Sequence, residues 1–394
     1  MLSRLPHLMA AHLWGVPLTL YFADRLIDRP NRRDAAWLTG VVAATAATSL
    51  YWLALAGLVV GVVIAAGLVT RRWRGAVAAG GASLAGLVIA SPILWPYLRF
   101  AAAGATRPIE LAAQFSATPA GYLTATSRLH AGWSATFFRD EVNVFFAGAA
   151  ALALAVVGIL VALRDVRSRR RMSTLVAVAV IGVVLSLGPS TAVYRWLYDW
   201  LPPLHGLRAP ARFGYLYLLA IAMAASFGLA ALVVRWPTRR ARATITGVAI
   251  AITAVEVTQA PIRTEPFDRV PPIYGFVGGL AGPVVLVEAP FFPADAVFEN
   301  GEYQLNATAH WRPLMNGTSG FTPRSYRRRA AVFWFFPRPG TVEAMKHEGA
   351  THLMVHLDRF DAREAELVRV ALFERPDLRL LAADGRGHRL YAIR

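Results

Sequence analysis

Long runs of uncharged and mostly apolar residues dominate the first two thirds of the chain. The longest covers residues 35–69, and shorter runs at 75–98, 142–163, 172–194 and 213–234 follow it. The hydrocarbon core of a bilayer is about 30 Å thick and takes roughly 20 helical residues to cross. Each of the four shorter runs therefore predicts one membrane-spanning helix.

The run at 35–69 is too long for one crossing, because its 35 residues would rise roughly 52 Å as a single helix. We expect a hairpin of two helices with a break at 49–52, where Tyr51 and Trp52 suit the water interface. Two weaker candidates, 5–23 and 243–262, bring the expected number of spans to about eight. The first lacks a signal-peptide cleavage site, and Glu256 in the second lies near one end, where it can reach water.

The distribution of arginine predicts the orientation of these helices. Residues 1–262 contain 24 Arg and 9 acidic residues, and 16 of these Arg fall in four short segments. The segments are 24–34, 71–74, 164–171 and 235–242. Basic residues in short loops are retained on the cytoplasmic side of a membrane. Because successive helices cross the membrane in opposite directions, we expect the loops at 99–141 and 195–212, and everything after residue 262, to lie outside.

The pattern after residue 262 is that of a small soluble domain. Short β-rich runs alternate with helical stretches, and the turn 384–387 joins two of the runs as a hairpin. The expected strands lie within 283–291, 351–357, 378–383 and 388–393, and the expected helices within 339–350 and 361–374. The predicted fold class is an α-helical polytopic membrane domain (1–262) followed by a small α/β extracytoplasmic domain (263–394).

Composition argues against nucleic-acid binding and excludes any cross-link or metal site that needs cysteine. The formal net charge is +17, but residues 263–394 carry 17 basic and 15 acidic residues, so the excess belongs to the membrane domain. The charge therefore predicts helix flanks and no nucleic-acid partner. The chain has no cysteine, which excludes disulfides and thiolate metal sites.

Five short motifs occur in order along the chain. They are His12-Leu13 with Pro17-Leu18, Glu141 with Phe146-Ala147-Gly148, Ser186-Leu187-Gly188-Pro189, Arg208-Ala209-Pro210-Ala211-Arg212-Phe213, and Asn316-Gly317-Thr318-Ser319-Gly320-Phe321. In this order the chain resembles polytopic bacterial proteins similar to the YfhO-like and GT-C-type glycosyltransferases, except that Ala147 stands where a proline is expected.

The resemblance implies a protein of the bacterial cytoplasmic (inner) membrane that transfers sugar from a polyprenyl-phosphate-linked donor in envelope glycan assembly. It also implies that several helices and the loop with the catalytic acid precede the region present here. The chain is then a partial one, or it needs a missing membrane half or a partner subunit. A non-catalytic scaffold of envelope polysaccharide assembly is the alternative, and a transporter is less favoured because the spans contain few polar groups.

Arg208 and Arg212 are the candidates for binding the lipid phosphate. They flank Pro210 at the predicted outer end of a span, and Arg engages phosphate bidentately. An interfacial anchor is the other interpretation of the pair. No cofactor or metal ligand set is predicted, and a divalent metal stays open.

The catalytic residue is not identified, and the outer loops offer four acids as weak candidates. They are Glu110, Asp140, Glu141 and Asp199. For Asp140 and Glu141 the alternative is a favourable interaction with the N-terminus of a helix that begins at 142, and for Asp199 it is an interfacial amphipathic segment. In the outer domain, the turn with Asn316, Gly317 and Gly320 either presents backbone N–H groups to a ligand or needs glycine for its backbone geometry.

Overall fold

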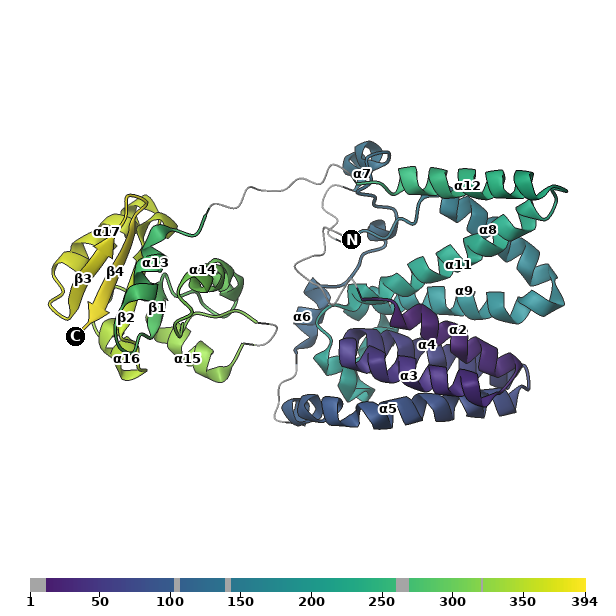
Figure 1. Ribbon diagram of the computed structural model, residues 1–394, viewed down its shortest axis with the longest axis horizontal. Coiled ribbons are helices and arrows are strands. Elements are labelled where there is room, and N and C mark those ends of the chain that lie inside the picture. The colour runs from purple at the N-terminus through teal and green to yellow at the C-terminus, as the bar shows by residue number, and fades with distance from the viewer. Residues whose placement is uncertain (1–11, 103–106, 139–142, 260–268, 320–321) are drawn as a thin grey trace. The chain divides into compact units, whose positions relative to one another are not determined.

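The computed structural model describes residues 12–102, 107–138, 143–259, 269–319 and 322–394. The chain divides into two units, Met1–Arg263 and Thr264–Arg394. The first is helical, and the second contains a small four-stranded sheet (Figure 1).

Eight longer helices form the described part of the first unit. They are α2 (Gly15–Asp28), α3 (Arg32–Thr48), α4 (Leu50–Val69), α5 (Trp73–Ala102), α8 (Ala149–Arg164), α9 (Val166–Ser186), α11 (Gly214–Val233) and α12 (Arg239–Glu256). Short helices occupy the connections: α6 (Ile109–Gln114), η2 (Ala120–Tyr122), α7 (Ala131–Phe137), η3 (Gly188–Ser190), α10 (Ala192–Trp200), η4 (Pro202–Gly206) and η5 (Pro210–Phe213).

The predicted break within 35–69 is confirmed. Ser49 alone separates α3 from α4, and its extended backbone (φ −168°, ψ 134°) ends the first helix. Its side-chain oxygen then accepts a hydrogen bond from the backbone N–H of Tyr51, 3.2 Å away, which caps the second helix. The start of α2 lies against the end of α3, and the end of α2 against the end of α4, so α3 and α4 run antiparallel.

Among the residues that the structure describes, three segments are long and apolar enough to cross a membrane: Leu50–Val69, Trp73–Phe100 and Pro210–Val233. Helix α8 is a shorter apolar helix. On α5, Leu84, Val88 and Ile89 are each 63% exposed, which is the apolar surface that lipid would cover. These helices indicate a membrane protein.

Several predicted helix ends are wrong. Helix α8 begins at Ala149 and not at residue 142, because residues 143–148 are not helical. Helix α9 ends at Ser186, eight residues before the predicted end, because Gly188 takes a positive φ of 55° and Pro189 follows it. Helix α12 ends at Glu256 and not at 262. Helix α2 continues to Asp28, past the predicted end at 23, and the start of that predicted span lies outside the described residues.

Helices α8 and α11 pack with their backbones in contact. A Cβ atom on Gly158 would lie 2.0 Å from the carbonyl oxygen of Ala224, and one on Gly228 would lie 1.9 Å from that of Leu154. The neighbouring buried positions are also small, with Ala155 on α8 among them. Small residues at four-residue spacing are typical of helix pairs in membranes, where close backbone packing replaces the hydrophobic effect as the source of stability.

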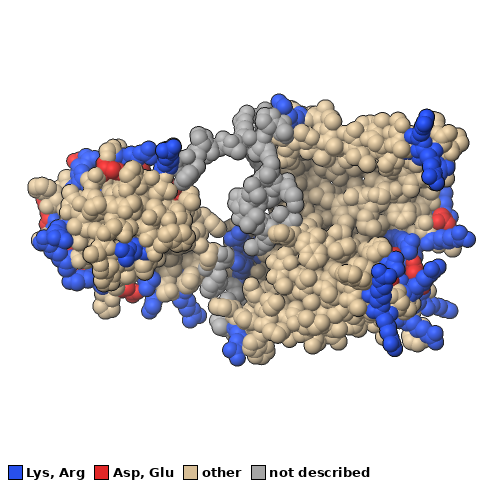
Figure 2. Space-filling model, viewed as in Figure 1, with Lys and Arg blue, Asp and Glu red and all other residues tan. Residues whose placement is uncertain are grey.

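The arginine-rich segments meet at one end of the helical unit. Arg170 and Arg171, at the start of α9, both pair with Asp24 and Asp28 near the end of α2, at 2.7–2.9 Å. Arg72, between α4 and α5, also pairs with Asp28. The turn between α11 and α12 lies at the same end, and Figure 2 shows the basic side chains concentrated there. The four segments therefore occupy one end, which is what a shared side of a membrane requires.

The second unit is built on a mixed four-stranded sheet. The strands are β1 (Leu286–Ala289), β2 (His352–His356), β3 (Leu378–Ala383) and β4 (His388–Ile393), in the order β1-β2-β4-β3. The helices are α13 (Pro272–Gly279), η6 (Val297–Glu299), α14 (Asn300–Asn306), η7 (Ala307–Ala309), α15 (Arg324–Phe333), α16 (Thr341–His347), η8 (Leu357–Arg359) and α17 (Ala362–Phe373). The strand β1 pairs parallel to β2, and the other pairs are antiparallel. The predicted mixed sheet and its β3-β4 hairpin are confirmed.

Both faces of this sheet are covered. Val287, Leu353 and Val355 face a core shared with α15, α16 and α17. Met354 and Leu390, on the opposite face, pack with α13. Because successive residues of a strand point to opposite faces, all four residues of β1 are buried, including the charged Glu288.

Candidate functional site

Tyr51 is the centre of a group of polar contacts at the end of the helical unit opposite its arginine-rich segments. Its hydroxyl oxygen accepts hydrogen bonds from the backbone N–H groups of Arg208 (2.6 Å) and Ala209 (3.1 Å). The Arg212 guanidinium lies over the Tyr51 ring, 4.1 Å from its centroid, and that of Arg208 lies 4.8 Å from the centroid of Phe115. Both predicted arginines are therefore fixed beside the start of α4.

A third arginine, Arg107, belongs to the same group. Its backbone N–H donates to the carbonyl oxygen of His205 (2.9 Å), and its carbonyl oxygen accepts from the hydroxyl of Tyr198. Burial and the nearby charge of Arg208 lower the pKa of the half-buried Arg107. Three cations thus share one region, and an anion beside them would relieve their repulsion. No local pattern in the sequence singles out Arg107, which is an isolated basic residue in a long connection.

Two of the four candidate acids lie near this group. Burial raises the pKa of Tyr198, and the carboxylates of Glu110 and Asp199 raise it further. Both acids are exposed to solvent. Asp140 and Glu141 lie outside the described residues, and the helix that was expected to begin at 142 begins at Ala149.

The carboxylate at the N-terminus of α8 comes instead from Glu256, at the end of α12. It accepts hydrogen bonds from the backbone N–H groups of Ala149 and Ala150, the latter at 2.9 Å. His130 Nε2 lies 2.7 Å from the same carboxylate, and the indole N–H of Trp133 donates to His130 Nδ1 at 3.0 Å. Because Nδ1 accepts, the proton of a neutral His130 is on Nε2 and is donated to Glu256.

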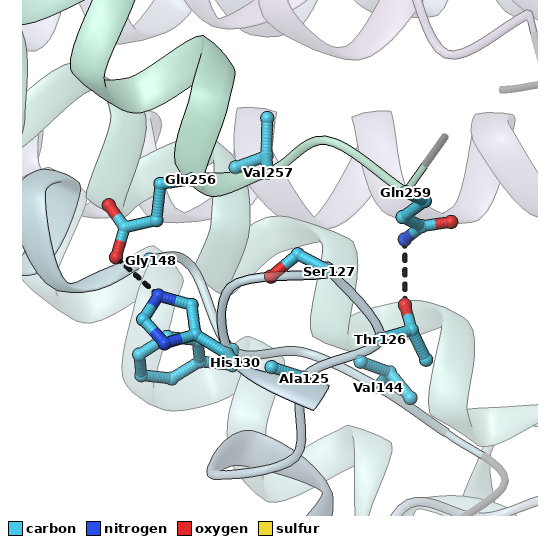
Figure 3. Close-up of a pocket in the computed structure, with 10 residues that line it drawn as sticks. Ala125, Thr126, Ser127, His130, Val144, Gly148, Glu256, Val257 and Gln259 are labelled. Carbon is cyan, nitrogen blue, oxygen red and sulfur yellow. Dashed lines mark hydrogen bonds and ion pairs between the residues drawn. The ribbon is translucent and has the colours of Figure 1, made fainter. Parts of the chain in front are cut away.

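His130 and Glu256 border a hollow of about 110 Å³ (Figure 3). Thr126, Ser127 and Gln259 add polar groups to its wall, and the amide of Gln259 donates to the Thr126 hydroxyl at 2.7 Å. The hollow is large enough to hold water. The Glu256 side chain is only 4% exposed and its carboxylate is bonded to protein groups, so the expectation that it simply reaches water is wrong. With three donors to the carboxylate and both imidazole nitrogens bonded, the pair suits a structural connection better than proton transfer.

The predicted ligand loop of the second unit is bonded to the sheet. The side-chain amide of Asn316 donates to the carbonyl oxygen of Glu288 (2.9 Å), and its oxygen accepts from the Glu288 N–H (2.7 Å). The carbonyl oxygen of Gly317 accepts from Asn300 at 3.3 Å. Asn316 therefore continues the hydrogen bonding of β1, which is a structural role. Gly320 lies outside the described residues.

Comparison with models of known protein families and with curated proteins finds no match to this chain.

Proposed function

We propose that the chain is a bacterial inner-membrane protein that binds a polyprenyl-phosphate-linked sugar and is related to the GT-C-type glycosyltransferases. The observation that carries the proposal is the group of Arg107, Arg208 and Arg212 around Tyr51. Arginine recognises phosphate bidentately, and aromatic rings beside it suit the membrane interface.

The position of these arginines along the helices also supports the proposal. Helix α4 begins at Leu50, beside Arg208, and ends at Val69, beside the arginine-rich segment 71–74. Its 20 residues rise about 30 Å, which is the thickness of a bilayer core. A lipid headgroup at one surface of the membrane would therefore meet the arginine group.

A non-catalytic subunit of envelope polysaccharide assembly is the second candidate function. Of the acids that the structure describes at this end of the helical unit, Glu110 and Asp199 are exposed, and Glu256 is bonded to α8 and His130. A general base must lie within hydrogen-bond reach of the acceptor hydroxyl, and burial is a common way to raise the pKa of a carboxyl group towards neutral pH. The described acids therefore favour binding of the lipid over transfer of the sugar by this chain alone.

The proposed topology has about eight spans, with the arginine-rich end cytoplasmic and the second unit outside. Reporter fusions at Arg171, Arg242 and Arg394 are expected to read inside, inside and outside, because basic loops are retained in the cytoplasm. The measurement is paired alkaline phosphatase and green fluorescent protein fusions at each position. An inside signal at Arg394 would contradict the arrangement.

Loss of one arginine is expected to weaken binding of a polyprenyl monophosphate to the purified chain in detergent. A charge-assisted contact contributes about 1.5–3 kcal/mol, so Arg208→Ala or Arg212→Ala should raise Kd roughly tenfold or more. Arg208→Lys should recover only part of the affinity, because an ammonium cannot bind bidentately.

Arg195→Ala is the matched control for these variants. Arg195 is exposed on α10 and donates to the carbonyl oxygen of Pro189. Its Kd should equal that of the unaltered protein, and a prenol without phosphate should not distinguish any of the variants. Equal phosphate affinity in Arg208→Ala, Arg212→Ala and the double variant would return the pair to the role of interfacial anchors.

A further inference from the structure

In the second unit, the face of the sheet that packs against α13 is polar at one end. Glu288, His356 and His388 point to the same face as Met354 and Leu390, and His356 pairs directly with His388 across β2 and β4. Glu288 is 0%, His356 2% and His388 6% exposed. Burial of an ionisable group is unfavourable unless the group is hydrogen-bonded or paired with an opposite charge. The hydrogen-bond partners of each group therefore determine which of its atoms can bind a ligand.

Each of the two histidines has one ring nitrogen beside a carboxylate. His356 Nε2 lies 2.7 Å from Glu288 Oε2, and His388 Nδ1 lies 2.7 Å from Asp384 Oδ2. The Asp384 carboxylate also accepts hydrogen bonds from the backbone N–H groups of Arg386 and His388, each at 3.0 Å. A carboxylate held in this way can fix the orientation of the His388 ring.

Three side chains converge beside these carboxylates. One ligand atom from each of His356, Asp358 and His388 lies within 4.8 Å of the other two. The ring nitrogens not bonded to Glu288 and Asp384 are His356 Nδ1 and His388 Nε2. His388 Nε2 is 3.6 Å from Asp358 Oδ1. Zinc bonds of about 2.0–2.1 Å place tetrahedral ligand atoms roughly 3.3 Å apart. The Asp358 side chain is 49% exposed, so it has freedom to close the remaining gap.

We propose that His356, Asp358 and His388 bind a zinc ion, with Glu288 and Asp384 orienting the two imidazoles. A metal-ligating histidine almost always donates its other N–H to a carboxylate or carbonyl oxygen, and both histidines here have a carboxylate in that place. Two imidazoles with one carboxylate suit zinc, whereas magnesium and calcium prefer oxygen ligands alone. A divalent cation also offsets the three carboxylates of the group, and the exposed side of Asp358 leaves a position for water.

The test is zinc binding by the purified full chain in detergent, after removal of metal with a chelator. Titration of zinc chloride against a fluorescent zinc chelator gives the affinity, and elemental analysis gives the stoichiometry. We expect one zinc ion per chain and a rise in Tm on addition of zinc. Asp384→Asn should weaken binding about 10- to 100-fold, and His388→Gln and Asp358→Asn should weaken it at least as much.

His352→Gln is the matched control. His352 lies at the other end of the same strand, and its Nδ1 is 2.8 Å from the Thr351 hydroxyl, outside the group. Its zinc affinity should be unchanged. Asp358→Asn is the ligand variant that should remain folded, because its half-exposed side chain can change without disturbing the core. Circular dichroism checks that it does.

Two results would overturn the proposal. One is zinc affinity in the unaltered chain no higher than in His388→Gln. The other is an equal loss of affinity in His352→Gln. In either case His388 is an ion-pair partner of Asp358 and Asp384 without a metal, and its replacement should lower Tm equally with and without zinc.

Discussion

Gly228→Ala is expected to destabilise the helical unit by about 3 kcal/mol, at the upper end of the range for overpacking. The added methyl group would lie 1.9 Å from the backbone oxygen of Leu154, and a helix backbone cannot rotate away as a flexible side chain can. Helices α8 and α11 would have to separate along their whole contact. Gly158→Ala meets the backbone oxygen of Ala224 at 2.0 Å and should behave alike.

The measurement is thermal unfolding in detergent, together with the yield of monodisperse protein. Gly61→Ala is the matched control, because a methyl group there meets nothing within 4 Å on the exposed face of α4. It should be neutral or stabilising by up to about 1 kcal/mol, since alanine favours a helix. If Gly228→Ala and Gly61→Ala unfold at the same temperature, the close backbone contact does not exist.

Glu256→Ala is expected to cost about 3 kcal/mol or more of the free energy of unfolding. The substitution removes the acceptor for the N–H groups of Ala149 and Ala150 and for Nε2 of His130. Removal of one partner of a buried pair leaves the other partner unsatisfied, which is the costly half of the change. Glu256→Gln keeps one acceptor oxygen and should lose less.

Asp199→Ala serves as the control, because that acid is exposed at the same end of the unit and should change stability by no more than about 0.5 kcal/mol. Hydrogen exchange adds a local measurement, since the amides of Ala149 and Ala150 should lose protection in Glu256→Ala. The losses of unfolding free energy in His130→Ala and in Glu256→Ala should also not add up in the double variant, because the two residues bond each other. Additive losses, or an effect no larger than that of Asp199→Ala, would show that the pair does not connect α12 to α8.

The features that sequence predicted well depend on local patterns. The break at Ser49 follows from a run too long for one crossing with aromatic residues at its middle. The strands β3 and β4 have the predicted bounds, because a polar glycine-containing turn separates two short apolar runs. The start of α17, within the predicted range 361–374, is equally local, because the Asp361 side chain accepts a hydrogen bond from the backbone N–H of Glu364 at 2.7 Å.

The features that sequence did not predict depend on partners far along the chain. Hydropathy identified the apolar helices α8 and α11 but gave no sign that Gly158 and Gly228 would meet. Arg107 joins Arg208 only because the connections fold onto the start of α4. Apolar content also placed the start of α8 too early, since residues 143–148 are uncharged without being helical. His356 and Asp358 are two residues apart, but their third partner, His388, arrives through strand pairing.

The dependence of α8 on Glu256 has a consequence for biosynthesis. The ribosome makes Ala149 and Ala150 more than a hundred residues before the acid that binds their N–H groups. During that interval α9 and α11 are synthesised while the N-terminus of α8 still lacks the Glu256 carboxylate. The final hydrogen bonds of α8 therefore form late, when α12 arrives, and a nascent chain arrested before residue 256 should expose this end of the helix to proteases.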